Sequence, residues 1–133
     1  MSPNLNPSVA ERNMDLLDPV FKNKLELALS QSAKNGVFVK VIETVRSQER
    51  QDWLYEQGRS RPGKIVTWTH NSKHKDGHAA DCIPCDKYGN LIWNPTDPAW
   101  TVWIEAVHSV EGLEWGGDWE KKSDPSHIEL KRD

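Results

Sequence analysis

The sequence has few cysteines, little net charge and no long apolar run, and each of these absences excludes a class of protein. Its two cysteines, Cys82 and Cys85, form a single Cys-x-x-Cys in 133 residues. A structural zinc module needs four ligands at paired spacings, and a thioredoxin-like motif needs a strand-to-helix junction in a βαβ unit. We therefore expect two ordinary thiols beside a strand. Whether they pair in an oxidising compartment stays open.

The charge balance and the apolar runs also limit the possible partners. The 17 basic and 20 acidic residues give a formal net charge of -3. This lacks the basic excess of a protein that binds the nucleic-acid backbone, so no nucleic-acid partner is expected. The first residues contain no basic segment followed by an apolar one, and no run approaches membrane-spanning length. We expect no signal peptide, no membrane insertion, synthesis in the cytoplasm and a monomer.

Local patterns predict one α+β domain over residues 1–133, in which a small antiparallel sheet packs with about three helices. Residues 1–18 are expected to form a loosely held arm, or a short helix around residues 9–17. Helices are expected over residues 18–36, 47–58 and 98–112 from their caps and apolar periodicity. Strands are expected over residues 37–44, 79–83, 91–93 and 127–130, with a hairpin turn at residues 88–90. Residues 59–71 and 115–119 are expected to be loops.

Two distant segments together offer the ligands of a catalytic zinc ion. Such an ion usually takes three protein ligands from His, Asp, Glu or Cys and leaves its fourth position for water. His74, Asp81 and His127 are such a set. Gly77 lets the chain turn between the first two ligands, and strand alternation turns His127 away from the core. We therefore predict a site for one Zn²⁺.

The neighbouring residues suggest hydrolysis of an amide. A zinc ion held by two imidazoles and one carboxylate can lower the pKa of its bound water to about 7. Asp124, three residues before His127, is placed to take that proton and to pass it to a leaving amine. Arg46, between a strand and a helix, is a candidate for stabilising the oxyanion.

Spacing alone leaves alternatives open. Surface histidines and aspartates in polar loops explain the same pattern equally well. His108 falls within a predicted helix, which suggests a surface residue. His70 and His78 border the motif without an assigned role, although His78 is a possible replacement ligand.

Two short patterns carry the candidate ligands. Ser72, His74, Gly77, Ala79 and Asp81 form Ser-x-His-x-x-Gly-x-Ala-x-Asp, and Asp124 stands three residues before a His-x-Glu-Leu-like segment of His127, Glu129 and Leu130. Both patterns resemble those of the zinc-dependent peptidoglycan peptidases, which include phage L-alanyl-D-glutamate endolysins and D-alanyl-D-alanine carboxypeptidases related to vancomycin resistance. Residues 44–59 and 112–119 look like the phage branch. Many relatives have glutamate at the position of Asp124.

The resemblance implies a D-alanyl-D-alanine carboxypeptidase/hedgehog-like fold and gives each candidate residue a role. His74, Asp81 and His127 would bind zinc. Asp124 would be the general base. Arg46 would lie beside the substrate or the oxyanion. Ser72, Trp115 and Trp119 would bind the substrate. A turn cap is the alternative role for Ser72, and a position in the core is the alternative for each tryptophan.

The resemblance also implies a biological setting. The leading hypothesis is a phage-type endolysin that cuts the L-Ala-D-Glu bond of peptidoglycan stem peptides. It would have no separate wall-binding domain, and would wait in the host cytoplasm until the inner membrane is breached. The alternatives are a D-alanyl-D-alanine carboxypeptidase with the same metal mechanism, and a non-catalytic zinc-containing module that binds wall peptide or a partner protein.

Overall fold

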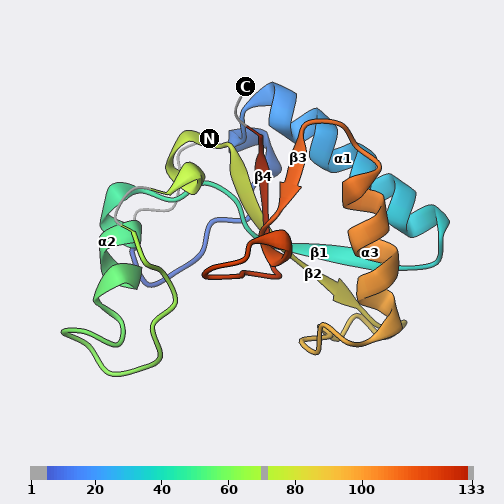
Figure 1. The fold of residues 1–133 in the computed structure, drawn as a ribbon. Helices are drawn as coiled ribbons and strands as arrows, with labels where there is room; N and C mark the ends of the chain where they lie inside the picture. Colours follow the sequence, from blue (N-terminus) through green and yellow to red (C-terminus); the bar gives the residue numbers. More distant parts are fainter. Residues whose placement is uncertain (1–5, 70–71, 132–133) are drawn as a thin grey trace.

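The computed structural model describes residues 6–69 and 72–131, and its elements form the predicted α+β fold (Figure 1). Four strands make one antiparallel sheet in the order β1-β2-β4-β3. The strands are β1 (Phe38–Glu43), β2 (Ala79–Cys85), β3 (Leu113–Trp115) and β4 (His127–Leu130). Among the residues described, no helix combines the length and the apolar character needed to cross a membrane.

Each of the three predicted α-helices begins at its expected cap. The helices are α1 (Pro19–Lys34), α2 (Gln48–Glu56) and α3 (Pro98–His108). The side chains of Asp18, Ser47 and Asp97 accept hydrogen bonds from backbone N–H groups of the first turn. Such bonds satisfy donors that the helix itself leaves unpaired.

Helix α3 ends four residues before the predicted Gly112. Beyond His108 the chain makes tighter bonds, from Val110 N–H to Val107 O and from Leu113 N–H to Val110 O. Gly112 then adopts a φ of 96° and turns the chain into β3. This three-residue strand is absent from the sequence-based prediction, because its three residues are too few for an alternating pattern.

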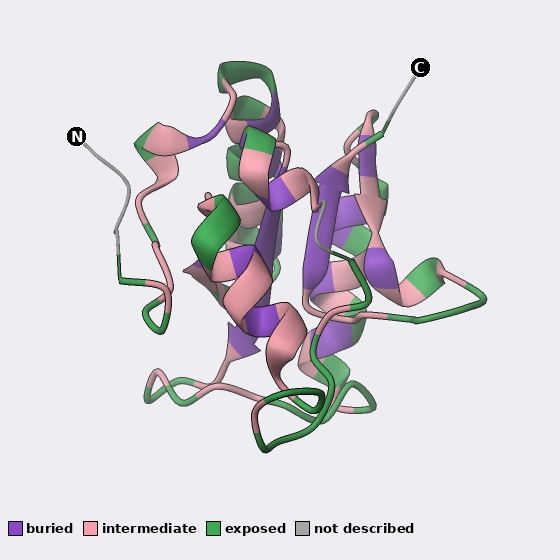
Figure 2. Cartoon of the chain, turned by 90° about the vertical axis from the view of Figure 1, so that its left-hand side faces the viewer, coloured by how far each residue is buried: buried purple, intermediate pink, exposed green. Residues whose placement is uncertain are grey.

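Helices α1 and α3 cover one face of the sheet, and α2 lies on the other side (Figure 1). The buried residues concentrate in the strands and on the helix faces that meet them (Figure 2). The core consists of Leu17, Phe21, Leu25, Ala28, Ala80, Cys82, Ile83, Trp100, Trp103, Ala106, Val107, Leu113 and Ile128.

The predicted hairpin after β2 forms only in part. The strand continues to Cys85, and the returning segment makes a single bridge through Leu91. A turn begins at Asn94, whose side chain accepts a hydrogen bond from Thr96 N–H, so the return ends before it can form a strand.

The N-terminal arm is held against β1 and α2 over its described residues. Thr44 N–H donates to Glu11 O at 2.7 Å, and Arg50 Nη1 donates to Pro7 O at 2.8 Å. Within residues 6–18 a 3-10 turn, η1 (Met14–Leu16), forms inside the range where a short helix is the expected alternative to a loose arm. Some carbonyl groups of the arm bond to the rest of the domain, whereas those of Asn13 and Met14 accept bonds within the arm, from the N–H groups of Leu16 and Leu17. Residues 1–5 lie outside the described part of the chain.

Candidate metal centre

Sheet register and one tight turn bring the three predicted metal ligands together. Asp81 on β2 pairs directly with His127 on β4. His74 lies in the 3-10 turn η2 (Lys73–Asp76), which leads into β2. Ser72 Oγ accepts the His74 N–H at 3.2 Å and so caps this turn. Gly77 ends it with a φ of 73°, and a Cβ there would lie 2.9 Å from the backbone N of Asp18.

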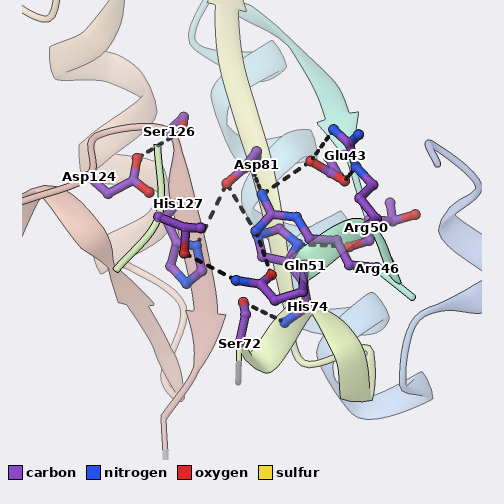
Figure 3. Close-up of polar contacts among 12 residues, drawn as sticks. Glu43, Arg46, Arg50, Gln51, Ser72, His74, Asp81, Asp124, Ser126 and His127 are labelled. Atoms are coloured by element: carbon purple, nitrogen blue, oxygen red, sulfur yellow. Dashed lines mark hydrogen bonds and ion pairs between the residues drawn. The ribbon is translucent and has the colours of Figure 1, made fainter. Parts of the chain in front are cut away.

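The ligand atoms of these residues surround one point. One atom from each of His74, Asp81 and His127 lies within 4.8 Å of the other two. Asp81 Oδ1 is 3.4 Å from His74 Nε2 and 3.7 Å from His127 Nδ1. Figure 3 shows Asp81 between the two histidines.

Burial makes this arrangement chemically informative. His74 is 1% exposed, Asp81 9% and His127 8%. His74 Nε2 and Asp81 Oδ1 are both buried without a hydrogen-bond partner in the described part of the chain. Leaving one such atom unsatisfied typically costs about 1–3 kcal/mol. A divalent cation bound by two imidazoles and one carboxylate would satisfy both atoms, so the triad fits a metal site.

The outer nitrogens of both histidines are held by oxygen atoms. His74 Nδ1 lies 2.7 Å from Thr44 O, and His127 Nε2 lies 2.9 Å from Glu129 Oε1. If these nitrogens carry the protons, His74 Nε2 and His127 Nδ1 have their lone pairs toward Asp81. Such outer contacts fix the tautomer and orientation of a metal-binding imidazole.

Arg46 contacts the ligand carboxylate on its other oxygen. Its Nη2 lies 3.1 Å from Asp81 Oδ2 and 3.1 Å from Glu43 Oε1. Gln51 accepts a hydrogen bond from Nη1, and Arg50 forms a close ion pair with Glu43. Arg46 thereby fixes one oxygen of Asp81 and leaves Oδ1 toward the histidines. It also lines the groove described below, and its predicted contact with an oxyanion stays a prediction.

The charges around the triad keep the carboxylates of Asp81 and Glu129 ionised. Burial favours the neutral acid at Asp81, but the two imidazoles and Arg46 hold its pKa well below the usual range. Burial likewise opposes a proton on His127, yet the nearby carboxylates of Asp81 and Glu129 raise its pKa to about 9. Burial would raise the pKa of Glu129, but His127 and Lys73 lower it to about 2. A metal ion that bound here at neutral pH would therefore displace a proton from His127.

A groove of about 800 Å³ opens above the triad, between residues 65–69 and 121–124. Asp124, Ser72 and Trp119 line it, and the Trp119 ring centroid is 5.2 Å from that of His127. Asp124 is half-buried, and its Oδ1 accepts a hydrogen bond from Ser126 Oγ at 3.0 Å. The structure thus gathers the predicted base and two of the three predicted substrate-binding residues around the triad.

Trp115 lies outside the lining of this groove. Its Nε1 donates to Pro125 O at 2.7 Å, and its ring packs against the core. These contacts give Trp115 a structural role in holding the loop before β4.

His78, His108 and the two cysteines do not join the triad. His78 lies 3.7 Å from Asp18 and His108 lies 2.7 Å from Asp118. Within the described ranges, His74, Asp81 and His127 are the only group of three that fits a metal. His70 lies outside these ranges. Cys82 is buried in the core and Cys85 is a free thiol that donates to Phe38 O.

Several residues of the site carry no role in the sequence-based prediction. The role of Glu129 could have been predicted from the sequence, because it follows His127 by two positions and therefore lies on the same face of the strand. The role of Glu43 could not have been predicted in this way, because it depends on the pairing of β1 with β2, which places Glu43 opposite Asp81. The other additions are Thr44, Arg50, Gln51 and Lys73.

Sequence comparisons relate this chain to peptidoglycan peptidases. Residues 66–130 match a family profile described as D-alanyl-D-alanine carboxypeptidase. The peptidoglycan L-alanyl-D-glutamate endopeptidase CwlK of Bacillus subtilis (strain 168) is 34% identical over 122 residues, which cover 86% of this chain and 73% of CwlK.

Solved structures share the fold. The L-Ala D-Glu endopeptidase ChiX of Serratia marcescens superposes with a TM-score of 0.69 at 26% identity, over 90% of this chain and 84% of ChiX. The vancomycin-resistance D,D-dipeptidase VanXYg gives a TM-score of 0.63 at 17% identity, over 96% of this chain and 58% of that one. The D,D-pentapeptidase VanY, solved with Zn(II), gives 0.57 at 14% identity, over 86% and 72% of the two chains.

Proposed function

Because this chain belongs to the M15 family of metallopeptidases, we propose that it is a zinc-dependent endopeptidase that hydrolyses the L-Ala-D-Glu bond of peptidoglycan stem peptides. The observation that carries this proposal is the pair of buried, unpartnered ligand atoms, His74 Nε2 and Asp81 Oδ1, beside a groove that also contains a carboxylate, Asp124. The two relatives that are most alike in sequence among those described above are named for this same bond.

The triad would hold one zinc ion through His74 Nε2, Asp81 Oδ1 and His127 Nδ1. When bound, zinc supplies a Lewis acid that polarises a carbonyl group and acidifies water. The protein's part is to keep the carboxylate of Asp81 ionised, to keep the two imidazoles neutral on the nitrogens that would face the metal, and to fix the orientation of all three side chains. Thr44 O, Arg46 and Glu129 do so, because each contacts the ligand on the atom that faces away from the metal position.

Asp124 handles the proton in this proposal. Its Oδ1 is engaged by Ser126, whereas Oδ2 has no hydrogen-bond partner among the residues that the structure describes. A free carboxylate oxygen in the groove accepts a proton from the attacking water and returns it to the leaving nitrogen. Aspartate is shorter than glutamate by one methylene, and the loop before β4 places it in the groove all the same.

The role of Asp124 is tested by Asp124→Asn, which keeps the size of the side chain and removes the proton acceptor. We expect full zinc content and an unchanged melting temperature, with kcat lower by roughly 10²–10⁴-fold. Retained turnover would reject Asp124 as the base. Asp118→Asn is a matched control, because it is the same substitution at a residue that pairs with His108 and does not line the groove, and we expect its activity to be unchanged.

The reaction itself is tested by incubating the zinc-loaded protein with defined muropeptides and identifying the products by mass spectrometry. We expect a glycan that ends in L-Ala and a peptide with a new amino-terminal D-Glu. Loss of one terminal D-Ala would indicate a D-alanyl-D-alanine carboxypeptidase. Binding of the muropeptides without cleavage would indicate a non-catalytic module.

We further propose that the enzyme serves host lysis as a phage endolysin, on the ground that residues 44–59 and 112–119 resemble the phage branch. In this setting it reaches peptidoglycan only after the inner membrane is breached. Expression in a Gram-negative host should then leave growth intact until the membrane is permeabilised, and lysis should follow. Lysis that is absent after permeabilisation, with active enzyme in the extract, would reject this role.

A further inference from the structure

The loop of residues 119–126 carries two lysines into the groove above the triad. Lys121 and Lys122 both line the groove and are exposed. In Figure 1 this loop and the loop of residues 59–69 extend on the side of the sheet that carries α2. Lys122 Nζ lies 5.3 Å from the ring centroid of Trp68, which also lines the groove and is 56% exposed. The two loops therefore meet across the groove through an ammonium group and an aromatic face.

The backbone of Lys122 supports a positional role for its side chain. Its φ is 56°, and it is the only residue other than glycine with a positive φ in the described part of the chain. A lysine in this left-handed region is strained, whereas glycine or asparagine is accommodated more readily. Strain of this kind in a groove-lining loop points to a function for the side chain that is placed there.

These two lysines also differ from the other lysine and arginine side chains of the groove. The other two that line it, Arg46 and Lys73, are paired, Arg46 with Glu43 and Asp81, and Lys73 with Glu129. Neither Lys121 nor Lys122 makes an ion pair with any residue that the structure describes. An ammonium group has three donors, so Lys122 can face Trp68 and still bind an anion.

The position of the loop indicates which part of a substrate meets these charges. Lys121 and Lys122 precede Asp124 by three and two residues. In the proposed reaction Asp124 returns a proton to the leaving nitrogen, so the leaving residue lies beside this loop. A glutamate in that place has two carboxyl groups, and the bond to the next residue uses at most one. The free carboxylate is then a few bonds from the nitrogen, within reach of a lysine side chain.

We propose that Lys121 and Lys122, with Trp68 holding the second ammonium group, form an anion subsite that binds the free carboxylate of the residue on the leaving side of the cleaved bond. This inference rests on the proposed peptidase function and adds the feature that selects an acidic leaving residue. The subsite acts through charge, so its contribution falls as salt screens it.

The test compares two muropeptides, one with that carboxylate free and one with it converted to a carboxamide. The zinc-loaded wild type should cleave the acid with a kcat/KM roughly tenfold above that for the amide, as expected for a charged hydrogen bond. This preference should shrink when the ionic strength is raised to about 1 M. The double variant Lys121→Gln/Lys122→Asn should lose the preference by lowering kcat/KM for the acid alone. Asparagine suits the left-handed backbone at position 122.

Two further variants make the result specific. Lys122→Arg keeps the charge and should keep the preference. Lys87→Gln removes a lysine that also lies over an aromatic ring, 5.1 Å from the centroid of Tyr88, but that does not line the groove. It should behave as the wild type. Zinc content and melting temperature, measured for every variant, identify one that fails to fold.

The outcomes separate the subsite from the peptidase function. Equal cleavage of acid and amide by the wild type would overturn the anion subsite and leave the peptidase intact. An equal loss on both substrates in the folded double variant would also overturn it, because the lysines would then only shape the loop. Cleavage of neither peptide by the wild type would reject the proposed function itself.

Discussion

A methyl group added at Gly116 should damage catalysis more than folding. Gly116 begins the 3-10 turn η3 (Gly116–Asp118) and is buried against the loop before β4. A Cβ there would lie 2.4 Å from Asp124 O and 3.0 Å from His127 Cβ. Gly116 is not among the positive-φ glycines, so it is required for space and not for its backbone angle.

The size of the effect follows from these distances. Ordinary van der Waals contact begins near 3.4 Å, so Asp124 must move by about 3.4 − 2.4 = 1.0 Å and the Cβ of His127 by about 3.4 − 3.0 = 0.4 Å. A catalytic group that is misplaced by about 1 Å can cost roughly 100-fold in rate. Overpacking of this kind lowers the free energy of unfolding by about 1–3 kcal/mol. We therefore expect Gly116→Ala to fold and bind zinc, with kcat/KM reduced about 100-fold.

The assay is muropeptide cleavage alongside urea unfolding and zinc content. Gly36→Ala is the control, because Gly36 has a φ of 92° but nothing within 4 Å of its Cβ position. It should lose about 1–2 kcal/mol through backbone strain alone and keep full activity. Wild-type kcat/KM in Gly116→Ala, or the same activity loss in Gly36→Ala, would refute the reasoning.

Three further predictions follow from contacts near the site. Glu129→Gln should weaken zinc binding by about 10–100-fold in a chelator competition, because it alters the partner of His127 Nε2; unchanged affinity would contradict the proposed positioning. Folding raises the pKa of His127 to about 9, so the proton on His127 stabilises the folded, metal-free protein. This stabilisation is complete below about pH 6.5 and is lost as the pH rises through about 9, so the melting temperature should fall over that range. The zinc-loaded protein, in which His127 is neutral, should not show this fall. Burial and the charge of Asp81 raise the pKa of Cys82, which keeps its thiol protonated and unreactive. At most one thiol of the native protein should therefore react with a disulfide reagent. An intramolecular disulfide should not form, because residues three apart on a strand are about 10 Å apart.

That His74, Asp81 and His127 meet at one point can be predicted from the sequence, because each lies in a short motif whose local structure is decided by its own residues. Ser72 caps the turn that holds His74, and Gly77 ends it, so the motif itself returns the chain to the strand with Asp81. Alternation along β4 places His127 and Glu129 on one face without knowledge of the rest of the fold.

The contacts around the ligands depend on strand pairing and are hidden from local patterns. Glu43 joins the site only because β1 pairs with β2 in a register that sets it opposite Asp81, next to an irregularity in the ladder. The carbonyl of Thr44 reaches His74 through the same pairing, and a backbone group leaves no signal in a sequence. Trp115 is expected beside the substrate because it lies in residues 112–119, which resemble the phage branch. That resemblance does not determine which way its ring points.

Strands and loops contribute different parts of the site, and this division has a consequence for specificity. The metal position is set by hydrogen-bonded register between β2 and β4 and by a capped turn, which are rigid elements. The opposite walls of the groove come from residues 65–69 and 121–124, which are loops. Loops tolerate substitution better than the elements that they connect. Changes in these two loops can therefore alter which peptide binds while His74, Asp81 and His127 keep their positions, so substrate choice and metal affinity should vary independently in variants of this chain.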